Sequence, residues 1–396
     1  MSTDEPTTDD VTADDAAVDD TASDVPDDEP ILSVDDVSVH YEPGGIVTRA
    51  LSDKKVRAVD GVSFDLYDND IVVLVGESGC GKTTLGKTAI GLEKPTEGSV
   101  KYRGQDIWNS KENPRDADIE FTEIRRAMQI IHQDPANALN SSRRVKAILS
   151  DPLKKYRDEL GPKEREDTIY RFLEFVDMMP PEDYAERYPH QLSGGEKQRV
   201  ALGRALLMNP DVILADEAIS ALDVSLRVGM MDLILDLQDT FDTSYIFISH
   251  DLANARYLAK RAGGRIAIMY LGEIVEIGPP EEILQNPTHP YTKVLKWSTP
   301  TVDPDVAKQR IQEDPPVREV DVPDPEDPPS GCKFHTRCPE AREVCTTEEP
   351  ERYETAGEST TACFRALETH EYWNSAELAD ADEDEYDAQE SAGFGD

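Results

Sequence analysis

Continuous apolar runs recur along the chain and predict buried strands. The clearest are Ile71–Val75, Val212–Ala215 and Tyr245–Ser249, which contain few polar residues. Apolar side chains at nearly every position are typical of a parallel sheet that helices cover on both faces. The first run ends in a glycine, and we expect a helix directly after it. The pattern therefore predicts an α/β domain.

Two earlier segments, Ile31–Tyr41 and Ala58–Leu66, predict further strands. The first alternates loosely between apolar and polar positions, as a strand with one exposed face does. A glycine-rich, basic insertion over Pro43–Arg57 separates the two segments. Later in the chain, Ile266–Ile277 predicts a short hairpin around Gly272, because a glycine between apolar runs favours a tight turn.

Residues 105–200 are richer in charge and show helical periodicity, so we predict an inserted helical subdomain there. Prolines are expected to interrupt its helices, because proline lacks the backbone N–H that a helix interior needs. These prolines are Pro114, Pro152, Pro162, Pro180 and Pro181. Beyond Pro279 prolines become frequent again, which predicts a linker into a small terminal module.

The charge of the chain is strongly acidic. Its 82 Asp and Glu residues outnumber 41 Lys and Arg, of which only 17 are Lys, and the net charge is −41. Residues 1–29 contribute −12 and residues 366–396 contribute −11, which leaves −18 for residues 30–365. Such a surface resembles that of proteins from salt-loving archaea, where screening lengths fall to about 3 Å at molar ionic strength. No long basic block is present, which argues against a nucleic acid partner.

The sequence also argues against a membrane-embedded or secreted protein. No apolar stretch approaches the roughly 18 to 20 residues that a membrane-spanning helix needs. The first 29 residues contain no Lys or Arg, whereas a secretory leader begins with positive charge. We therefore expect a cytoplasmic protein.

A complete phosphate-loop motif follows the first buried run. It consists of Gly76, Glu77, Ser78, Gly79, Cys80, Gly81, Lys82 and Thr83, with Thr84 next. The glycines let backbone N–H groups turn toward phosphates, and the helix that follows adds its partial positive charge. Lys82 is expected to reach the β and γ phosphates of ATP, and the Thr83 hydroxyl to bind magnesium.

The second buried run ends in two acids, Asp216 and Glu217. Asp216 closes the strand and is expected to help hold the magnesium ion. Glu217 points at another angle and is expected to act as the general base toward water.

The segment Leu192-Ser193-Gly194-Gly195-Glu196 precedes these acids by about 20 residues. With it, the chain resembles the nucleotide-binding subunits of ATP-binding-cassette (ABC) transporters. Ser193 and the two glycines begin a helix whose free N–H groups can donate hydrogen bonds to a γ phosphate. The resemblance implies that this phosphate belongs to ATP on a facing subunit, so that two cassettes enclose two ATP molecules.

The same resemblance assigns four further residues. Gln133 matches a glutamine that contacts magnesium and water, and His250, which lies 33 positions after Glu217, matches a histidine that holds the γ phosphate. Asp223 lies in a segment that matches the loop linking the two ATP sites of the family's dimer. Tyr41 matches the aromatic residue that stacks on the base.

The sequence departs from the family pattern at three positions. Ala218 and Ile219 follow Glu217 where the family usually has Pro and Thr, and His132 replaces an aromatic residue. None of these is a catalytic group, so the expectation of hydrolysis stands.

Segments near the C-terminus narrow the resemblance to importers of oligopeptides and dipeptides. They are the run Met269–Glu276, the run Asn286–Thr292 and the run Gly331–Pro339. The implied function is ATP hydrolysis coupled to peptide uptake. The implied partners are two transmembrane permease subunits, a second and related ATPase subunit, favoured over an identical one, and indirectly an extracellular substrate-binding protein. The implied location is the cytoplasmic face of the membrane.

Four cysteines lie within 32 residues of the terminal module, at Cys332, Cys338, Cys345 and Cys363. Their spacings are five, six and seventeen residues, unlike the two-residue gap of most zinc knuckles. Relatives in this branch hold a four-iron four-sulfur cluster on similarly placed cysteines, and thiolates are suitable ligands. An iron–sulfur cluster, zinc or another ion, and unliganded thiols all remain open.

The expected fold is a P-loop NTPase (RecA-like) core with an antiparallel β subdomain, a helical subdomain and a small cysteine-containing module. The predicted boundaries are an acidic leader over 1–29, the nucleotide-binding domain over 30–280, the extension over 281–366 and an acidic tail over 367–396. Both ends are expected to be disordered, because they cannot bury enough apolar area to offset the entropy of ordering. The alternatives are an importer of nickel or sugars, and a soluble cassette ATPase that acts on DNA or ribosomes.

Overall fold

The computed structural model describes residues 29–42, 55–134, 139–299, 315–319 and 321–378. Its largest sheet has eight strands in the order β11-β12-β10-β9-β3-β8-β7-β6. The five strands from β9 to β6 are parallel, whereas β10, β11 and β12 join antiparallel at one edge. The strands are β3 (Ile71–Val75), β6 (Met128–Ile131), β7 (Val212–Asp216), β8 (Ser244–Ser249), β9 (Arg265–Tyr270), β10 (Glu273–Gly278), β11 (Tyr353–Glu354) and β12 (Thr360–Thr361). The predicted buried strands and the predicted hairpin are confirmed.

Burial on both faces explains why β3 is apolar at every position. Ile71, Val73 and Val75 point into one hydrophobic cluster, while Val72 and Leu74 point into another. Since successive side chains of a strand point to opposite faces, a sheet with two covered faces needs an apolar residue at each position.

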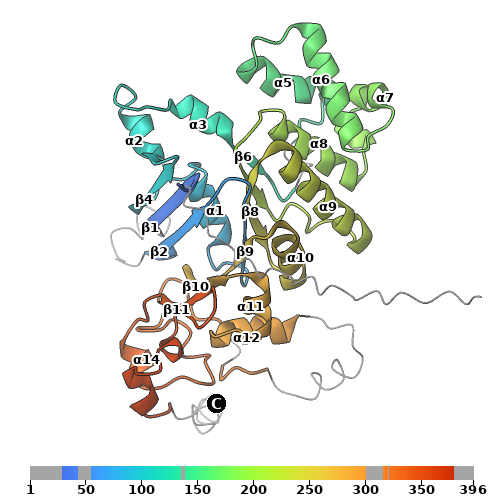
Figure 1. Ribbon diagram of the computed structural model, residues 1–396. Helices are drawn as coiled ribbons and strands as arrows, with labels where there is room; N and C mark the ends of the chain where they lie inside the picture. The colour runs from blue at the N-terminus through green and yellow to red at the C-terminus, as the bar shows by residue number, and fades with distance from the viewer. Residues whose placement is uncertain (1–28, 43–54, 135–138, 300–314, 320, 379–396) are drawn as a thin grey trace, which may run out of the picture.

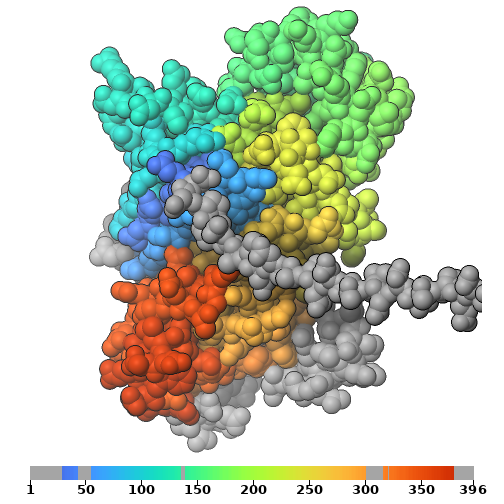
Figure 2. Space-filling model, viewed as in Figure 1, coloured from blue at the N-terminus to red at the C-terminus, as the bar shows by residue number. Residues whose placement is uncertain are grey.

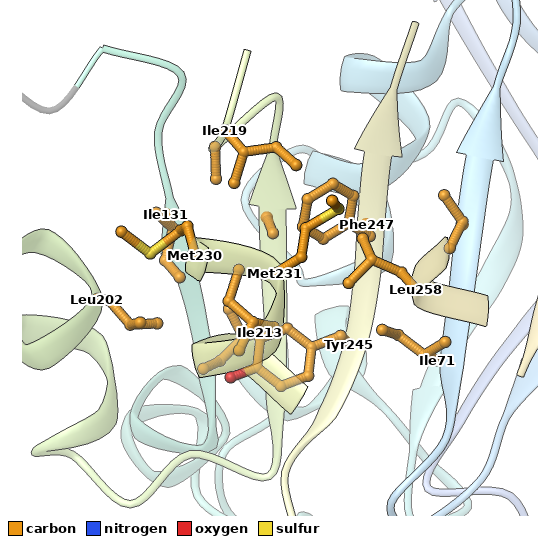
Figure 3. Packing of buried hydrophobic residues seen from close by; sticks show 14 of the residues in the cluster. Ile71, Ile131, Leu202, Ile213, Ile219, Met230, Met231, Tyr245, Phe247 and Leu258 are labelled. Atoms are coloured by element: carbon orange, nitrogen blue, oxygen red, sulfur yellow. The ribbon is translucent and has the colours of Figure 1, made fainter. Parts of the chain in front are cut away.

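Helices cover one face of the large sheet. They are α8 (Gly194–Leu206), α9 (Val224–Phe241) and α10 (Leu252–Ala262), which bring apolar side chains into the first cluster. Figure 3 shows Met231 and Leu258 from these helices packed around Tyr245 and Phe247 of β8 and Ile213 of β7.

The opposite face carries α1 (Lys82–Ala89) and a second, four-stranded sheet. This sheet is antiparallel and has the order β2-β1-β4-β5. Its strands are β1 (Leu32–Tyr41), β2 (Val56–Leu66), β4 (Glu97–Tyr102) and β5 (Gln105–Asp106). The strands predicted over Ile31–Tyr41 and Ala58–Leu66 are confirmed, and the structure shows that they pair with each other. Most of the basic insertion between them lies outside the described residues.

Residues 105–200 are largely helical, in line with the expected helical subdomain, although they also contribute the strand β6 to the core sheet. Its helices are α2 (Ile107–Glu112), α3 (Phe121–Ala127), α5 (Val145–Tyr156), α6 (Pro162–Phe175), α7 (Pro181–Glu186) and the 3₁₀ turn η1 (Pro189–Gln191). Between them, β6 pairs with β7 and closes the edge of the core sheet. In Figure 1, α5, α6 and α7 project from the core at the end opposite the C-terminal segments.

The prolines of this region act differently from one another. Pro162 and Pro181 occupy the first positions of α6 and α7, where a missing N–H costs nothing. Pro152, however, lies inside α5, so the predicted break there is wrong. Leu149 and Leu153 are buried on either side of Pro152, and this packing holds the helix together across the lost hydrogen bond.

The C-terminal segments form a module against β10. It contains α11 (Pro280–Gln285), α12 (Pro290–Ser298), α14 (Val344–Thr347) and the 3₁₀ turns η2 (Phe364–Ala366) and η3 (Glu371–Asn374). The backbone N–H of Ala362 donates to the carbonyl oxygen of Val275 in β10 at 2.8 Å, and β12 extends the sheet there. Figure 2 shows this module as the orange and red end of the molecule.

The predicted acidic tail is wrong for residues 367–378, which fold onto the module. Tyr372 is buried and its hydroxyl donates to the Glu340 carbonyl at 2.7 Å. Arg342 pairs with Glu377 at 3.2 Å. Tyr372 and Leu378 supply packed apolar area, which the average composition of this acidic stretch did not indicate. Residues 1–28 and 379–396 lie outside the described residues, and within the described ranges no helix is long and apolar enough to cross a membrane.

Candidate functional site

The phosphate loop lies between the end of β3 and the start of α1, as the motif predicted. Two of its glycines have no room for a side chain. A Cβ at Gly76 would lie 2.2 Å from the Met269 carbonyl oxygen, and one at Gly81 would lie 2.0 Å from that of Ala58. Gly81 also has φ of 105°, a conformation that favours glycine. The loop thus wraps closely around neighbouring backbone and leaves Ser78 and Gly79 exposed.

Lys82 is held inside the loop that precedes it. Its ammonium donates to the carbonyl oxygens of Gly76 and Glu77, both at 2.8 Å, and lies 3.7 Å from the Cys80 sulfur. The side chain is buried. The ammonium is therefore held within the phosphate loop, where phosphate oxygens can replace the two carbonyl oxygens as its hydrogen-bond partners.

Thr83 and Asp216 come together from two different strand ends. The Thr83 hydroxyl donates to the Asp216 carboxylate at 3.0 Å, across the end of β8, which lies between β3 and β7. Asp216 is buried at the last position of β7. A hydroxyl and a carboxylate this close offer the oxygen ligands that magnesium prefers.

Glu217 lies at the centre of a group of three polar side chains. Gln133 donates to its carboxylate at 2.7 Å, and His250 Nδ1 lies 3.8 Å from the same oxygen. The three residues follow β7, β6 and β8, whose carboxyl ends meet at one edge of the sheet. Glu217 has φ of 47°, in the left-handed region, directly after the end of β7.

Tyr41 closes β1 and stands beside the helix that follows the phosphate loop. The residue is 41% exposed, so part of its side chain is accessible to a flat ligand. The hydroxyl donates to Glu93 and bonds to Thr84. Burial and the Glu93 carboxylate raise the pKa of Tyr41, so the hydroxyl keeps its proton.

The signature residues form a helix start that faces solvent. Ser193 caps α8: its hydroxyl accepts from the Glu196 N–H at 3.3 Å, and Glu196 accepts from the Ser193 N–H at 2.7 Å. Gly194 is exposed, and a Cβ there would meet nothing within 4 Å. Asp223 caps α9 in the same way. Ser193 and Asp223 each form side-chain hydrogen bonds within their own helix start.

The four clustered cysteines line one enclosed cavity in the C-terminal module. Its wall consists of Cys332, Cys338, Cys345 and Cys363 together with apolar residues such as Phe334 and Phe364. Burial, with a smaller effect of the neighbouring thiols, raises the pKa of Cys338 to about 12 and that of Cys363 to about 11. Over the described ranges, however, no three His, Cys, Asp or Glu side chains are arranged to hold a single metal ion.

The sequence interpretation missed two residues that contact the phosphate loop from the C-terminal module. Arg337 donates to both carboxylate oxygens of Glu77, at 3.0 and 3.2 Å. The Tyr291 hydroxyl accepts from the Glu77 N–H at 3.0 Å. Both residues lie in segments that resemble the importer family, but no sequence signal indicates that these segments contact the phosphate loop.

This geometry defines a P-loop ATPase of the ABC type. The family model for ABC transporters matches residues 59–220, and that for the oligopeptide/dipeptide transporter C-terminal region matches residues 275–345. Two solved structures resemble the chain. CbiO1 of Clostridium perfringens, part of the transporter complex cbiONQ, has a TM-score of 0.56 at 21% identity and covers 72% of this chain and 100% of its own. The dimeric cassette MJ0796, bound to ADP and Pi, has a TM-score of 0.52 at 27% identity and covers 63% of this chain and 98% of its own.

Curated relatives identify the branch. The oligopeptide transport ATP-binding protein AppF of Bacillus subtilis is 40% identical over 85% of this chain and 97% of its own length. The dipeptide transport ATP-binding protein DppF of Haemophilus influenzae is 40% identical over 78% and 90%, and OppF of Salmonella typhimurium is 38% identical over 81% and 92%. The chain belongs to the ATP-binding subunits of the oligopeptide and dipeptide transporter family. It is an ATP-hydrolysing transporter subunit, and ATP and magnesium are its expected ligands.

Proposed function

We propose that this ATPase powers the uptake of dipeptides or oligopeptides through a separate membrane permease, at the cytoplasmic face of the membrane. The observation that carries the proposal is the C-terminal module. It is the part of the chain that matches the oligopeptide/dipeptide transporter region, and it is packed on the cassette core rather than tethered to it. The cargo is chosen by the permease and by a substrate-binding protein outside the cell.

Transport by the native complex tests this function. The chain is purified from membranes at its native salt concentration with its permease and ATPase partners, and the complex is placed in lipid vesicles. We expect ATP-dependent accumulation of a labelled dipeptide or oligopeptide when the matching binding protein is added. Accumulation of nickel or a sugar instead of peptides would contradict the proposed peptide cargo but would be consistent with the ATPase mechanism.

The nucleotide phosphates are received by the phosphate loop. Its backbone N–H groups and Lys82 neutralise the β and γ phosphates. Thr83, Asp216 and Gln133 would hold the magnesium ion, which supplies further neutralisation of phosphate charge. Tyr41 stacks on the adenine base with the accessible part of its side chain.

Hydrolysis then depends on where Glu217 holds its carboxylate. As general base it removes a proton from the water that attacks the γ phosphate. Gln133 fixes one carboxylate oxygen by its 2.7 Å hydrogen bond, and His250 stands next to the same oxygen, from where it contacts the γ phosphate.

The site is completed by a second cassette. The solvent-facing helix start at Ser193, Gly194 and Gly195 binds the γ phosphate of ATP held by the partner, and Asp223 lies on the loop that joins the two sites. The dimeric form of the cassette MJ0796 supports this arrangement. We favour a related ATPase subunit as the partner over a second copy. Two permease subunits dock on the helical subdomain.

The cysteine cavity holds a four-iron four-sulfur cluster under this proposal. Four thiols on one buried cavity fit the ligand set of such a cluster, and a cluster does not need three side chains placed for a single ion. Burial keeps these thiols protonated, and a positively charged inorganic core would compensate the loss of their protons.

Isolation without oxygen tests the cluster. We expect visible iron–sulfur absorbance and stoichiometric iron and sulfide, both of which Cys338→Ser removes. Cys80→Ser serves as the matched control, because Cys80 is also buried but lies in the phosphate loop, and it should keep the chromophore. Colourless protein without iron would contradict the proposed iron–sulfur cluster. Stoichiometric zinc would show instead that the four cysteines bind zinc.

The acidic surface suits a high-salt cytoplasm, such as that of a halophilic archaeon. The net charge is −41, and the acidic side chains that cause it repel one another in dilute salt. We expect the unfolding temperature to rise as KCl increases from about 0.1 M to about 1 M, since the screening length falls from about 10 Å to about 3 Å. Circular dichroism measured against temperature checks this. An unfolding temperature that is unchanged or lower in high salt would contradict it.

A further inference from the structure

Glu77 places a negative charge in the loop that must receive the phosphates of ATP. It directly follows Gly76, and its carbonyl oxygen is one of the two that hold the Lys82 ammonium. Its side chain is 29% exposed, so water screens the carboxylate only in part. An unpaired carboxylate here would repel the phosphates of the nucleotide. It would also weaken the electrostatic attraction between Lys82 and those phosphates.

Arg337 forms a bidentate ion pair with the carboxylate of Glu77. Both terminal nitrogens donate to the Glu77 carboxylate, at 3.0 and 3.2 Å, which is the strongest geometry for such a pair. The Arg337 side chain is 5% exposed. Burial lowers the pKa of Arg337, but the pair with Glu77 outweighs this, so the guanidinium stays charged.

The surroundings fix Arg337 in this position. Its guanidinium lies 5.8 Å from the centre of the Tyr270 ring and 5.7 Å from that of Phe334. Its neighbour in the same loop, Lys333, is also buried and pairs with Asp60 at 2.7 Å and Glu273 at 2.5 Å. The arginine is therefore part of a rigid contact between the C-terminal module and the core.

The backbone of Glu77 is held from the same side. Its N–H donates to the hydroxyl of Tyr291, which is fully buried against Tyr270 and Phe334. The C-terminal module thus contacts both the backbone and the side chain of one residue of the phosphate loop.

We propose that Arg337 is a positioning residue of the ATP site: it neutralises Glu77 and turns that carboxylate away from the phosphates, so the C-terminal module completes the phosphate loop. The proposal extends the ATPase activity of the chain and does not depend on which solute is transported. The competing explanation is that Arg337 only attaches the module to the core.

A double-mutant cycle on the native complex separates the two explanations. Arg337→Met leaves Glu77 charged and unpaired, and we expect the KM for ATP to rise about tenfold to a hundredfold while kcat at saturating ATP changes much less. Adding Glu77→Gln removes the unpaired charge, so the double variant should recover most of the lost affinity for ATP. Arg337→Lys should fall between the wild type and Arg337→Met, because lysine keeps the charge without the bidentate geometry.

Lys333→Met is the matched control for attachment. It removes a buried cation from the same loop, and its partners lie outside the phosphate loop, so it should lower the unfolding temperature without a selective rise in KM. A rise in KM of equal size for Lys333→Met, or no recovery on adding Glu77→Gln, would reduce Arg337 to an attachment residue. Absence of ATPase activity in the wild-type complex would instead count against the function itself.

Discussion

Glu217→Gln is expected to abolish turnover while ATP still binds. Glutamine has the shape of glutamate, and its carbonyl oxygen can still accept the hydrogen bond that Gln133 now makes to Glu217 at 2.7 Å. What the variant lacks is a group that can take a proton from water. Since general-base catalysis contributes about 10²-fold to 10⁴-fold, we expect kcat to fall by that factor.

The measurement pairs steady-state ATPase rates with equilibrium binding of ATP to the same preparation. Glu123→Gln is the matched control, because Glu123 is an exposed glutamate on α3 whose side chain is 59% accessible and which loses the same charge. It should keep the wild-type rate. Near wild-type turnover in Glu217→Gln would remove Glu217 from the role of base.

Gly194→Asp is expected to prevent the two cassettes from closing on ATP. The position is exposed, and a side chain there meets nothing within 4 Å, so the fold of the subunit should be kept. An aspartate suits a free helix start, but it would place a carboxylate where the partner's γ phosphate must bind. We expect ATP binding by the isolated subunit to stay, ATP-dependent dimerisation to be lost, and turnover to fall by about a hundredfold or more.

Gly194→Ala separates charge from size at the same position. A methyl group adds no charge, so this variant should retain much more dimerisation and turnover than Gly194→Asp. Sedimentation with ATP in the Glu217→Gln background, which holds nucleotide without hydrolysing it, gives the clearest readout of dimerisation. Normal ATP-dependent dimers of Gly194→Asp would show that the helix start at Ser193 does not face a nucleotide.

Much of the cassette core could be predicted because its signals are local. The apolar run Ile71–Val75 marks a strand buried on both faces, and the glycines after it mark a loop that only glycine can form. Likewise, Asp216 and Thr83 were both expected to bind magnesium, and the structure places them 3.0 Å apart because parallel strands end at the same edge of the sheet.

Other features were misjudged because they depend on packing between distant segments. Pro152 lies in a helix whose buried leucines outweigh the missing hydrogen bond, and β6 is a strand within a region of helical periodicity. The stretch over residues 367–378 reads as an acidic tail, yet the burial of Tyr372 in the module folds it.

The sequence alone determined the chemistry of this protein, since each catalytic motif is a short run whose spacing sets its geometry: the phosphate loop, the acid pair and the signature segment. Only the tertiary structure decided that the C-terminal module contacts the phosphate loop. Arg337 and Glu77 are 260 residues apart, and no sequence motif connects the phosphate loop that contains Glu77 with the segment that contains Arg337. Their pairing follows from the packing of β10 and the module, which no local pattern encodes.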